Sequence, residues 1–183
     1  KHVAAYLELE KCQEEGLVKS IGVSNYAVED IEELLQEASV VPAVNQIEFN
    51  PFLYRRKTLD YLTKKGIRVQ AYRALRDGKA FDDATINAVA AKHGATPAQV
   101  LGAWCVAKGA IYMPKSTRRE RMVENANVFD LAAALDADDF SQLDALTTPE
   151  AIAAYKALYE KCVVRDTPLN EDDPGIKRDI TAG

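Results

Sequence analysis

The stretch KHGATPAQVLGAWCVAKGAIYMP, residues 92–114, decides the fold, because it ends one helix, starts another and leads into a short strand. Gly94 is expected to stop the first helix, since glycine takes the left-handed backbone of a helix end without strain. Thr96 and Gln99 have the spacing of a capping box, and Pro97 suits the first helical position. The stretch therefore predicts two successive helices followed by a strand.

The apolar run that closes this stretch is followed directly by another helix start. Thr117 and Glu120 again have capping-box spacing. The same alternation of apolar run and helix occurs earlier in the chain. The expected strands are 20–24, 43–49, 67–72 and 110–113; the expected helices are about 3–15, the run from Val28, 55–65, 82–93, the run from Pro97, the run that Thr117 opens, 137–146 and 150–161. Four strands, each followed by helical sequence, predict an α/β fold of four parallel β/α units plus C-terminal helices.

Composition limits the classes of protein that this chain can belong to. It has 183 residues, 48% of them hydrophobic, which fits a single globular domain. Its net charge of -5 argues against a general role on nucleic acid or on an anionic membrane surface. No apolar run approaches the roughly 20 residues of a membrane span, and no signal-peptide pattern opens the chain. We therefore expect no nucleic-acid partner, no membrane span and a cytoplasmic location.

The cysteines do not indicate a disulfide framework or a zinc site. Cys12, Cys105 and Cys162 are far apart, odd in number and without CxxC spacing. We expect reduced, buried thiols.

Polar side chains follow the expected strands, at the end where parallel β/α folds bind their ligands. They are Ser24 and Asn25 after the first strand, Gln46, Glu48 and Asn50 on or after the second, Tyr72 after the third, and Lys115 and Ser116 after the fourth. Short amides and hydroxyls can hold a carboxamide, and a tyrosine ring can stack on a flat heterocycle. Ser24 and Asn25 are equally well explained as helix caps, and Tyr72 as a core aromatic.

A basic cluster surrounds the helix start that follows the fourth strand. Its members are Lys115, Arg118, Arg119 and Arg121. Free backbone N–H groups and the helix dipole already favour an anion at such a helix start, so additional cations there predict a phosphate site. The alternative is a solvated surface turn whose cations pair with Glu120 and Glu124.

Five segments resemble the C-terminal half of an aldo-keto reductase. They are GLVKSIGVSNY, PAVNQIEFNP, GIRVQAY, KHGATPAQVLGAW and PKSTRRERMVENANVFD, and together they span about residues 1–147 in the family's order. The resemblance implies the C-terminal half of a (β/α)8 TIM barrel, a family that binds NADP(H) and reduces aldehydes and ketones. We expect the half barrel to cover residues 1–162, with residues 163–183 as an extended tail.

The resemblance also implies roles for individual residues. Ser24, Asn25 and Gln46 would hold the nicotinamide carboxamide, Tyr72 would stack on the nicotinamide ring, Lys115, Ser116 and Arg121 would bind the 2′-phosphate, and Glu124 and Asn125 would contact the adenine. The planar guanidinium of arginine and the point charge of lysine suit such a phosphate.

The chain departs from the family pattern at two places. Where the family commonly reads AYSPL, this chain reads AYRAL, so Arg73 replaces a small hydroxyl beside the pyrophosphate path and Ala74 replaces a turn proline. The pyrophosphate contact then passes through Arg73 or is made by other groups. Asn50 and Pro51 stand where the family often has HP, a difference of little weight.

The family's catalytic Asp, Tyr, Lys and His come from the first half of the barrel, and these residues have no counterpart here. His2 precedes a helix, and His93 fits a favourable contact at a helix end. Because hydride transfer to a carbonyl needs an acid to protonate the oxygen, we expect this chain alone not to turn over a carbonyl substrate.

Half a barrel would leave strand edges and an inner face uncovered. The missing N-terminal half, a second copy of this chain or a different protein partner would cover them. Two functions remain open: the cofactor-binding half of an NADP-dependent reductase, which acts on a small carbonyl substrate only when completed, and a non-catalytic structural or interaction subunit. The acidic balance disfavours a third, a phosphate or RNA contact module.

Overall fold

The structure is a computed structural model that describes residues 2–154. These residues form two compact units. Unit 1 comprises residues 2–47, 55–69 and 152–154, and unit 2 comprises residues 48–54 and 70–151. The predicted tail and most of the predicted 150–161 helix lie outside the described residues.

Four parallel strands form one sheet in the order β1-β2-β3-β4, as the sequence predicted. They are β1 (Val23–Ser24), β2 (Val44–Glu48), β3 (Arg68–Tyr72) and β4 (Ile111–Tyr112). Ser24 lies opposite Gln46 across β1 and β2, and Ala71 lies opposite Tyr112 across β3 and β4. The two end strands are shorter than predicted, with two paired residues each. The fold class is α/β, consistent with part of a (β/α)8 barrel.

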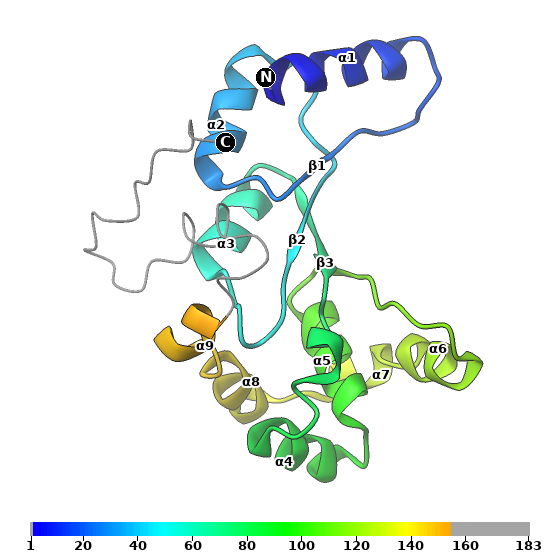
Figure 1. Cartoon of the computed structure of the whole chain (residues 1–183), viewed down its shortest axis with the longest axis vertical. Helices are drawn as coiled ribbons and strands as arrows, with labels where there is room; N and C mark the ends of the chain where they lie inside the picture. The colour runs from blue at the N-terminus through cyan, green and yellow to red at the C-terminus, as the bar shows by residue number, and fades with distance from the viewer. Residues whose placement is uncertain (1, 155–183) are drawn as a thin grey trace. The chain divides into compact units, whose positions relative to one another are not determined.

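Unit 1 contains helices α1 (His2–Glu14), α2 (Val28–Glu37) and α3 (Arg56–Lys64) (Figure 1). Apolar side chains from these helices and the strands between them make its core, among them Tyr6, Ile31, Leu34, Ile47, Leu62 and Ile67. The Tyr6 hydroxyl donates a hydrogen bond of 3.1 Å to the Val40 carbonyl, so α1 is also tied to the segment after α2.

Unit 2 is mostly helical. A short 3-10 turn, η1 (Arg76–Gly78), precedes α4 (Ala84–His93), α5 (Pro97–Ala107), α6 (Arg119–Ala126), α7 (Phe129–Ala134), α8 (Ala137–Asp144) and α9 (Pro149–Ala154), whose last three residues belong to unit 1. The central helix is α5, and the Trp104 side chain on it is fully buried. Its ring lies 4.9 Å from that of Phe49 and 5.1 Å from that of Tyr54, so an aromatic cluster anchors this unit.

Local capping chemistry decides several helix ends as predicted. Gly94 ends α4 with a positive φ of 60°. At the start of α5, the Thr96 hydroxyl accepts from the Gln99 N–H at 3.2 Å, and the Gln99 side chain accepts from the Thr96 N–H at 3.1 Å. A cap of this kind stabilises a helix by about 1 kcal/mol.

Two predicted caps are wrong. The N-cap of α6 is Arg118, without a side-chain cap, because the Ser116 hydroxyl accepts the Arg118 N–H at 3.1 Å and so replaces the predicted box of Thr117 and Glu120. Neither Ser24 nor Asn25 caps α2, which starts at Val28. Helix α7 was not predicted.

Lysine, histidine and aspartate side chains join α4 to α8; we call Lys92, His93, Asp136 and Asp139 the α4–α8 charge cluster. Lys92 Nζ lies 2.7 Å from both Asp136 Oδ2 and Asp139 Oδ1, and His93 Nε2 lies 2.8 Å from Asp139 Oδ2. Asp139 is fully buried. Burial alone would raise the pKa of Asp139, but hydrogen bonds from Lys92, the Asp136 N–H and His93 outweigh it and lower the pKa to about 2.

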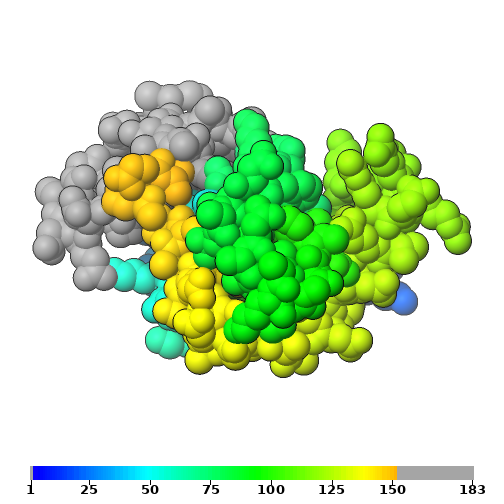
Figure 2. Space-filling model, turned by 90° about the horizontal axis from the view of Figure 1, so that it is seen from below, coloured from blue at the N-terminus to red at the C-terminus, as the bar shows by residue number. Residues whose placement is uncertain are grey.

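Figure 2 shows the green segment that contains α4 beside the yellow segment that contains α8, the two helices that this cluster joins. Among residues 2–154, we find no helix with the length and apolarity of a membrane span.

Candidate cofactor-binding site

The first three predicted site residues are neighbours at the carboxyl ends of β1 and β2 in unit 1. The Ser24 hydroxyl donates to the Gln46 carbonyl at 3.0 Å, and the Asn25 N–H donates to the same oxygen at 2.9 Å. Asn25 has a φ of 58°, a left-handed conformation that asparagine tolerates better than most residues. Parallel pairing of the two strands thus brings the predicted carboxamide-binding residues together.

Asn45 holds this turn in place, a role that the sequence did not reveal. Its side chain is fully buried and exchanges two hydrogen bonds with the backbone of Tyr26, of 3.3 Å to the N–H and 2.8 Å to the carbonyl. The only sequence signal was an amide on the strand face opposite Gln46, where an apolar side chain is usual.

Tyr72 ends β3 and belongs to unit 2, where its carbonyl accepts from the Phe49 N–H at 3.4 Å. The turn after it has an unusual backbone, because Arg73, Arg76 and Asp77 all have positive φ values near 50°. Such conformations cost of order 1 to 3 kcal/mol each and persist only where surrounding contacts hold them. Ala74, in place of the family's proline, is buried in this turn.

Arg73 makes the contacts that hold the turn. Its NH2 lies 2.7 Å from Asp77 Oδ2, and its NH1 lies 3.3 Å from Glu48 Oε2. Glu48 is buried, and burial raises the pKa of its carboxyl group, an effect that Arg73 and Arg76 oppose. The Arg73 guanidinium, which stands where the family has a small hydroxyl, therefore forms ion pairs with two carboxylates.

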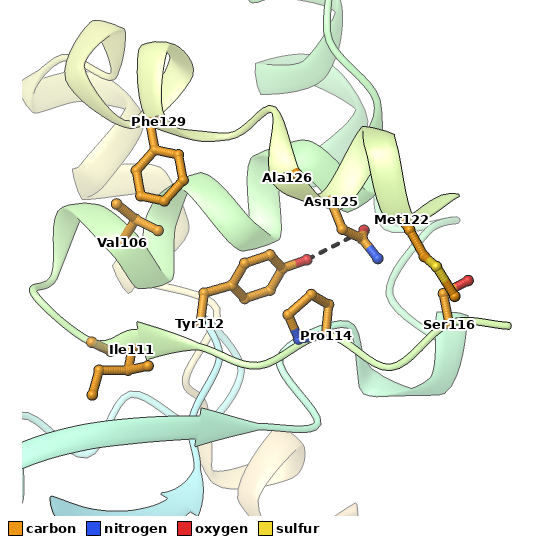
Figure 3. Close-up of a pocket in the computed structure, with 10 residues that line it drawn as sticks. Val106, Ile111, Tyr112, Pro114, Ser116, Met122, Asn125, Ala126 and Phe129 are labelled. Carbon is orange, nitrogen blue, oxygen red and sulfur yellow. Dashed lines mark hydrogen bonds between the residues drawn. The ribbon is translucent and has the colours of Figure 1, made fainter. Parts of the chain in front are cut away.

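A pocket of about 610 Å³ opens between β4, α5, α6 and α7 in unit 2. Its lining is Val106, Ala110, Ile111, Tyr112, Pro114, Ser116, Met122, Asn125, Ala126 and Phe129. Figure 3 shows two ends. The apolar end has Val106, Ile111 and Phe129. The polar end has Ser116 and Asn125, with the apolar Met122 beside them, and Tyr112 lies between the two ends.

Tyr112 and Asn125 meet inside this pocket. The Tyr112 hydroxyl donates to Asn125 Oδ1 at 3.4 Å, and the Asn125 amide nitrogen points away from Tyr112 toward the Ser116 end (Figure 3). Burial raises the pKa of Tyr112, so the phenol stays a donor. Gly102 on α5 lets the ring lie this close, because a Cβ there would come within 2.8 Å of it.

The basic cluster lies at the start of α6, beside the polar end of the pocket. Lys115, Arg118, Arg119 and Arg121 are exposed, and within the described residues none of them forms an ion pair. The predicted alternative was pairing with Glu120 and Glu124. Instead, Glu124 Oε1 accepts a hydrogen bond of 2.5 Å from the Thr96 hydroxyl on α5.

The nine predicted site residues therefore fall into two groups. Ser24, Asn25 and Gln46 are adjacent in unit 1; Tyr72, Lys115, Ser116, Arg121, Glu124 and Asn125 are in unit 2, where Ser116 and Asn125 line one pocket. We find no group of His, Cys, Asp and Glu side chains suited to a metal ion within residues 2–154.

Comparison with known proteins identifies the family. The profile of the Aldo/keto reductase family matches residues 3–148. The chain is 36% identical over 152 residues to a glyoxal reductase of Bacillus subtilis (83% of this chain, 54% of the relative) and 38% identical over 156 residues to the methylglyoxal reductase DkgB of Salmonella typhimurium (81% and 57%).

Solved structures agree. A crystal structure of Gox0644 in its apo form superposes with a TM-score of 0.77 at 37% identity, covering 82% of this chain and 55% of that one. A variant of Gox0644 in complex with NADPH has the same TM-score and identity, with 81% and 54% covered. The chain belongs to the aldo-keto reductase family, and it spans about half the length of the relatives that it matches.

Proposed function

We propose that this chain is the NADP(H)-binding part of an aldo-keto reductase that reduces small carbonyl compounds. Membership of the family supports this, as do relatives named as glyoxal and methylglyoxal reductases and a structural neighbour solved with NADPH. When bound, the cofactor would supply the hydride. The residues of this chain would bind it and orient it.

The observation that carries the proposal is the exposed basic cluster beside the polar end of the pocket, whose four cations form no ion pair within residues 2–154. Four exposed cations close in sequence repel each other, and within the described residues neither Glu120 nor Glu124 forms an ion pair with them; Glu124 accepts a hydrogen bond from Thr96. An anion at the start of α6 would relieve this repulsion and accept from free helix N–H groups. We assign Lys115, Ser116 and Arg121 to the 2′-phosphate.

The polar end of the pocket suits the adenine. The Asn125 amide nitrogen points toward the Ser116 end, where a ring nitrogen could accept from it, and Met122 offers an apolar contact for a flat ring. Glu124 keeps a second carboxylate oxygen for the amino group. Ser24, Asn25 and Gln46 of unit 1 are proposed to hold the nicotinamide carboxamide. Tyr72 of unit 2 is proposed to stack on the nicotinamide ring.

Carbonyl reduction also needs an acid that protonates the substrate oxygen as hydride arrives. The family's acid and its three partner residues would come from a half barrel outside this chain. We therefore propose that the chain binds NADP(H) alone and reduces a carbonyl only when such a half completes it.

The test is a fluorescence titration of the chain with NADPH and with NADH. Lys115→Ala and Arg121→Ala should each weaken the binding of NADPH by about 1 to 3 kcal/mol, or about 5- to 150-fold in affinity. Each removes a charged hydrogen bond to the phosphate. The affinity for NADH, which has no 2′-phosphate, should change little. Arg119→Ala removes the same charge from the same turn and is the matched control. Equal losses for both nucleotides would contradict the phosphate assignment.

One observation favours the non-catalytic alternative. Arg73 is tied to Glu48 and Asp77 at the position where the family has a small hydroxyl beside the pyrophosphate. If that contact is lost, the chain would keep the fold as a structural or interaction subunit. In that case the wild-type titration would show no NADPH binding at submillimolar concentration.

A further inference from the structure

The last turn of α6 is tied to the start of α5 by two hydrogen bonds. The Thr96 hydroxyl donates to Glu124 Oε1 at 2.5 Å, and the Gln99 side-chain nitrogen donates to the Asn127 carbonyl at 3.2 Å. Thr96 and Gln99 also form the capping box of α5. The cap that starts α5 therefore fixes the end of α6 that carries Glu124 and Asn125, the two residues assigned to the adenine. All of these residues belong to unit 2.

The Thr96 hydroxyl has one hydrogen, and its other hydrogen bond directs that hydrogen to Glu124. The hydroxyl oxygen accepts from the Gln99 N–H at 3.2 Å, so the hydrogen is left for the carboxylate. An ionised carboxylate accepts hydrogen bonds and donates none. Because Thr96 holds Glu124 Oε1, the second oxygen of Glu124 is an acceptor at a defined place on α6.

Tyr112 orients Asn125 in a similar way from β4. Its hydroxyl donates to Asn125 Oδ1 at 3.4 Å, and Gly102 leaves the space that the ring needs. Burial raises the pKa of Tyr112, so the phenol keeps the hydrogen that it donates. Turning the buried Asn125 amide over would bring its NH2 group to the phenol and take away the acceptor of that hydrogen, which is unfavourable. The amide nitrogen is therefore held toward the Ser116 end of the pocket (Figure 3).

Glu124 and Asn125, next to each other on α6, together present a hydrogen-bond acceptor and a donor. Adenine has the complementary pair on one edge, since its 6-amino group donates and the neighbouring ring nitrogen accepts. A 6-oxopurine keeps that ring nitrogen but has an oxygen at position 6, so two acceptors would face each other at Glu124. Glu124 can therefore distinguish the two bases, whereas Asn125 can bind the ring nitrogen of both.

We propose that Thr96 and Tyr112 are positioning residues through which α6 selects a nucleotide with a 6-aminopurine base over one with a 6-oxopurine base. Thr96 acts through Glu124 and sets the discrimination at position 6. Tyr112 acts through Asn125 and sets the affinity for either purine. This selection rests on the proposed function, in which Glu124 and Asn125 contact the adenine of NADP(H).

The test is a fluorescence titration of the chain with NADPH and with its hypoxanthine analogue, in which an oxygen replaces the 6-amino group. The wild-type chain should bind NADPH about tenfold more tightly, because the analogue mismatches one hydrogen bond. Both nucleotides carry the same phosphates and nicotinamide, so the ratio of their affinities is insensitive to the basic cluster. Equal affinities would overturn the selection and leave the proposed function standing. Failure to bind either nucleotide would overturn both.

Thr96→Asp separates the capping of α5 from the donation to Glu124. Aspartate caps a helix as well as threonine does, but its ionised carboxylate has no hydrogen to donate and repels Glu124. The affinity ratio should therefore fall toward equality. Thr96→Ser keeps both the cap and the hydroxyl hydrogen, so this matched control should keep the wild-type ratio. An unchanged ratio in Thr96→Asp, or a ratio lost in both variants, would overturn the role of Thr96.

Tyr112→Phe removes the hydroxyl and keeps the ring. Without the phenol the Asn125 amide can rotate, and we expect both nucleotides to bind about fivefold more weakly while their affinity ratio stays unchanged. Tyr61→Phe removes the same group from α3 in unit 1 and is the matched control, which should leave both affinities as in the wild type. Unchanged affinities in Tyr112→Phe, or a changed ratio, would overturn the role of Tyr112. A purely structural role of Thr96 and Tyr112 would not separate the affinity ratio from the affinities.

Discussion

Two charged regions of unit 2 are built in opposite ways. In the α4–α8 charge cluster, Lys92, His93, Asp136 and Asp139 satisfy one another across two helices at 2.7 to 2.8 Å. In the basic cluster at the start of α6, within the described residues, no cation has a carboxylate partner. The charges of the first region pair with one another, and those of the second are exposed to solvent.

We infer from this difference that the α4–α8 charge cluster stabilises the fold and that the basic cluster is available to bind a ligand. Removing the charge of the buried Asp139 takes an ion-pair partner from both Lys92 and His93, so stability falls. Removing an exposed, unpaired cation relieves repulsion and leaves nothing unsatisfied. Variants in the two regions should therefore differ in which quantity they change, stability or binding.

Asp139→Asn should have the largest effect on stability. The change removes the charge that faces Lys92 and His93 from a fully buried position. We expect a loss of about 3 kcal/mol in the free energy of unfolding, at the lower end for a broken buried ion pair. Urea unfolding measures it. Asp138→Asn is the matched control, since this exposed neighbour accepts only from Gln142 among the described side chains and should cost less than about 0.5 kcal/mol. Equal losses in the two variants would contradict the role of the cluster.

Acid should remove the difference between wild type and Asp139→Asn. The pKa of Asp139 falls from its ordinary value of 3.8 to about 2 on folding. A carboxyl group whose pKa is lowered by folding stabilises the protein above its unfolded pKa, and this stabilisation disappears as the pH falls through the folded pKa. The stability gap between the two proteins should therefore be constant above about pH 5 and shrink as the pH falls from about 4 to 2. A gap that persists at pH 2 would mean that ionisation of Asp139 is not its source.

Arg121→Ala should have the smallest effect on stability. Its side chain is exposed and forms no ion pair with the described residues, so we expect a change within about 0.5 kcal/mol in urea unfolding. Added NADPH should stabilise the wild-type chain more than this variant, because only the wild type keeps the complete phosphate contact. A loss above 1 kcal/mol without nucleotide would assign Arg121 a structural role instead.

The sequence predicted the parts of the fold that depend on neighbouring residues. Gly94, Thr96 and Gln99 were placed correctly, because their hydrogen bonds join residues three or four positions apart. Thr117 was wrong for an equally local reason: the Ser116 hydroxyl bonds the Arg118 backbone and takes over the start of α6. At a helix start such as that of α6, more than one hydroxyl can accept a backbone N–H, and the three-dimensional backbone decides which one does.

In the candidate site, too, some contacts could be predicted from the sequence and others could not. The approach of Ser24 to Gln46 followed from two parallel strands ending side by side. The contact of Arg73 with Glu48 did not follow, because it depends on a left-handed backbone at Arg73 itself, where the sequence has no glycine to indicate it. The pairing of His93 with Asp139 joins residues 46 positions apart, beyond the reach of any local pattern.

Trp104 is an intrinsic fluorescence probe of unfolding. It is the only tryptophan in the chain, it is fully buried in unit 2, and its indole N–H donates to Asp144 at 2.8 Å. Solvation of the ring on unfolding would shift its emission to longer wavelengths, so tryptophan emission, excited selectively over the tyrosines, reports on the unfolding of unit 2 and not of unit 1. Far-ultraviolet circular dichroism follows the helices of both. Coincident transitions by the two signals would mean that the units melt as one cooperative body, and separate transitions would mean that each melts by itself.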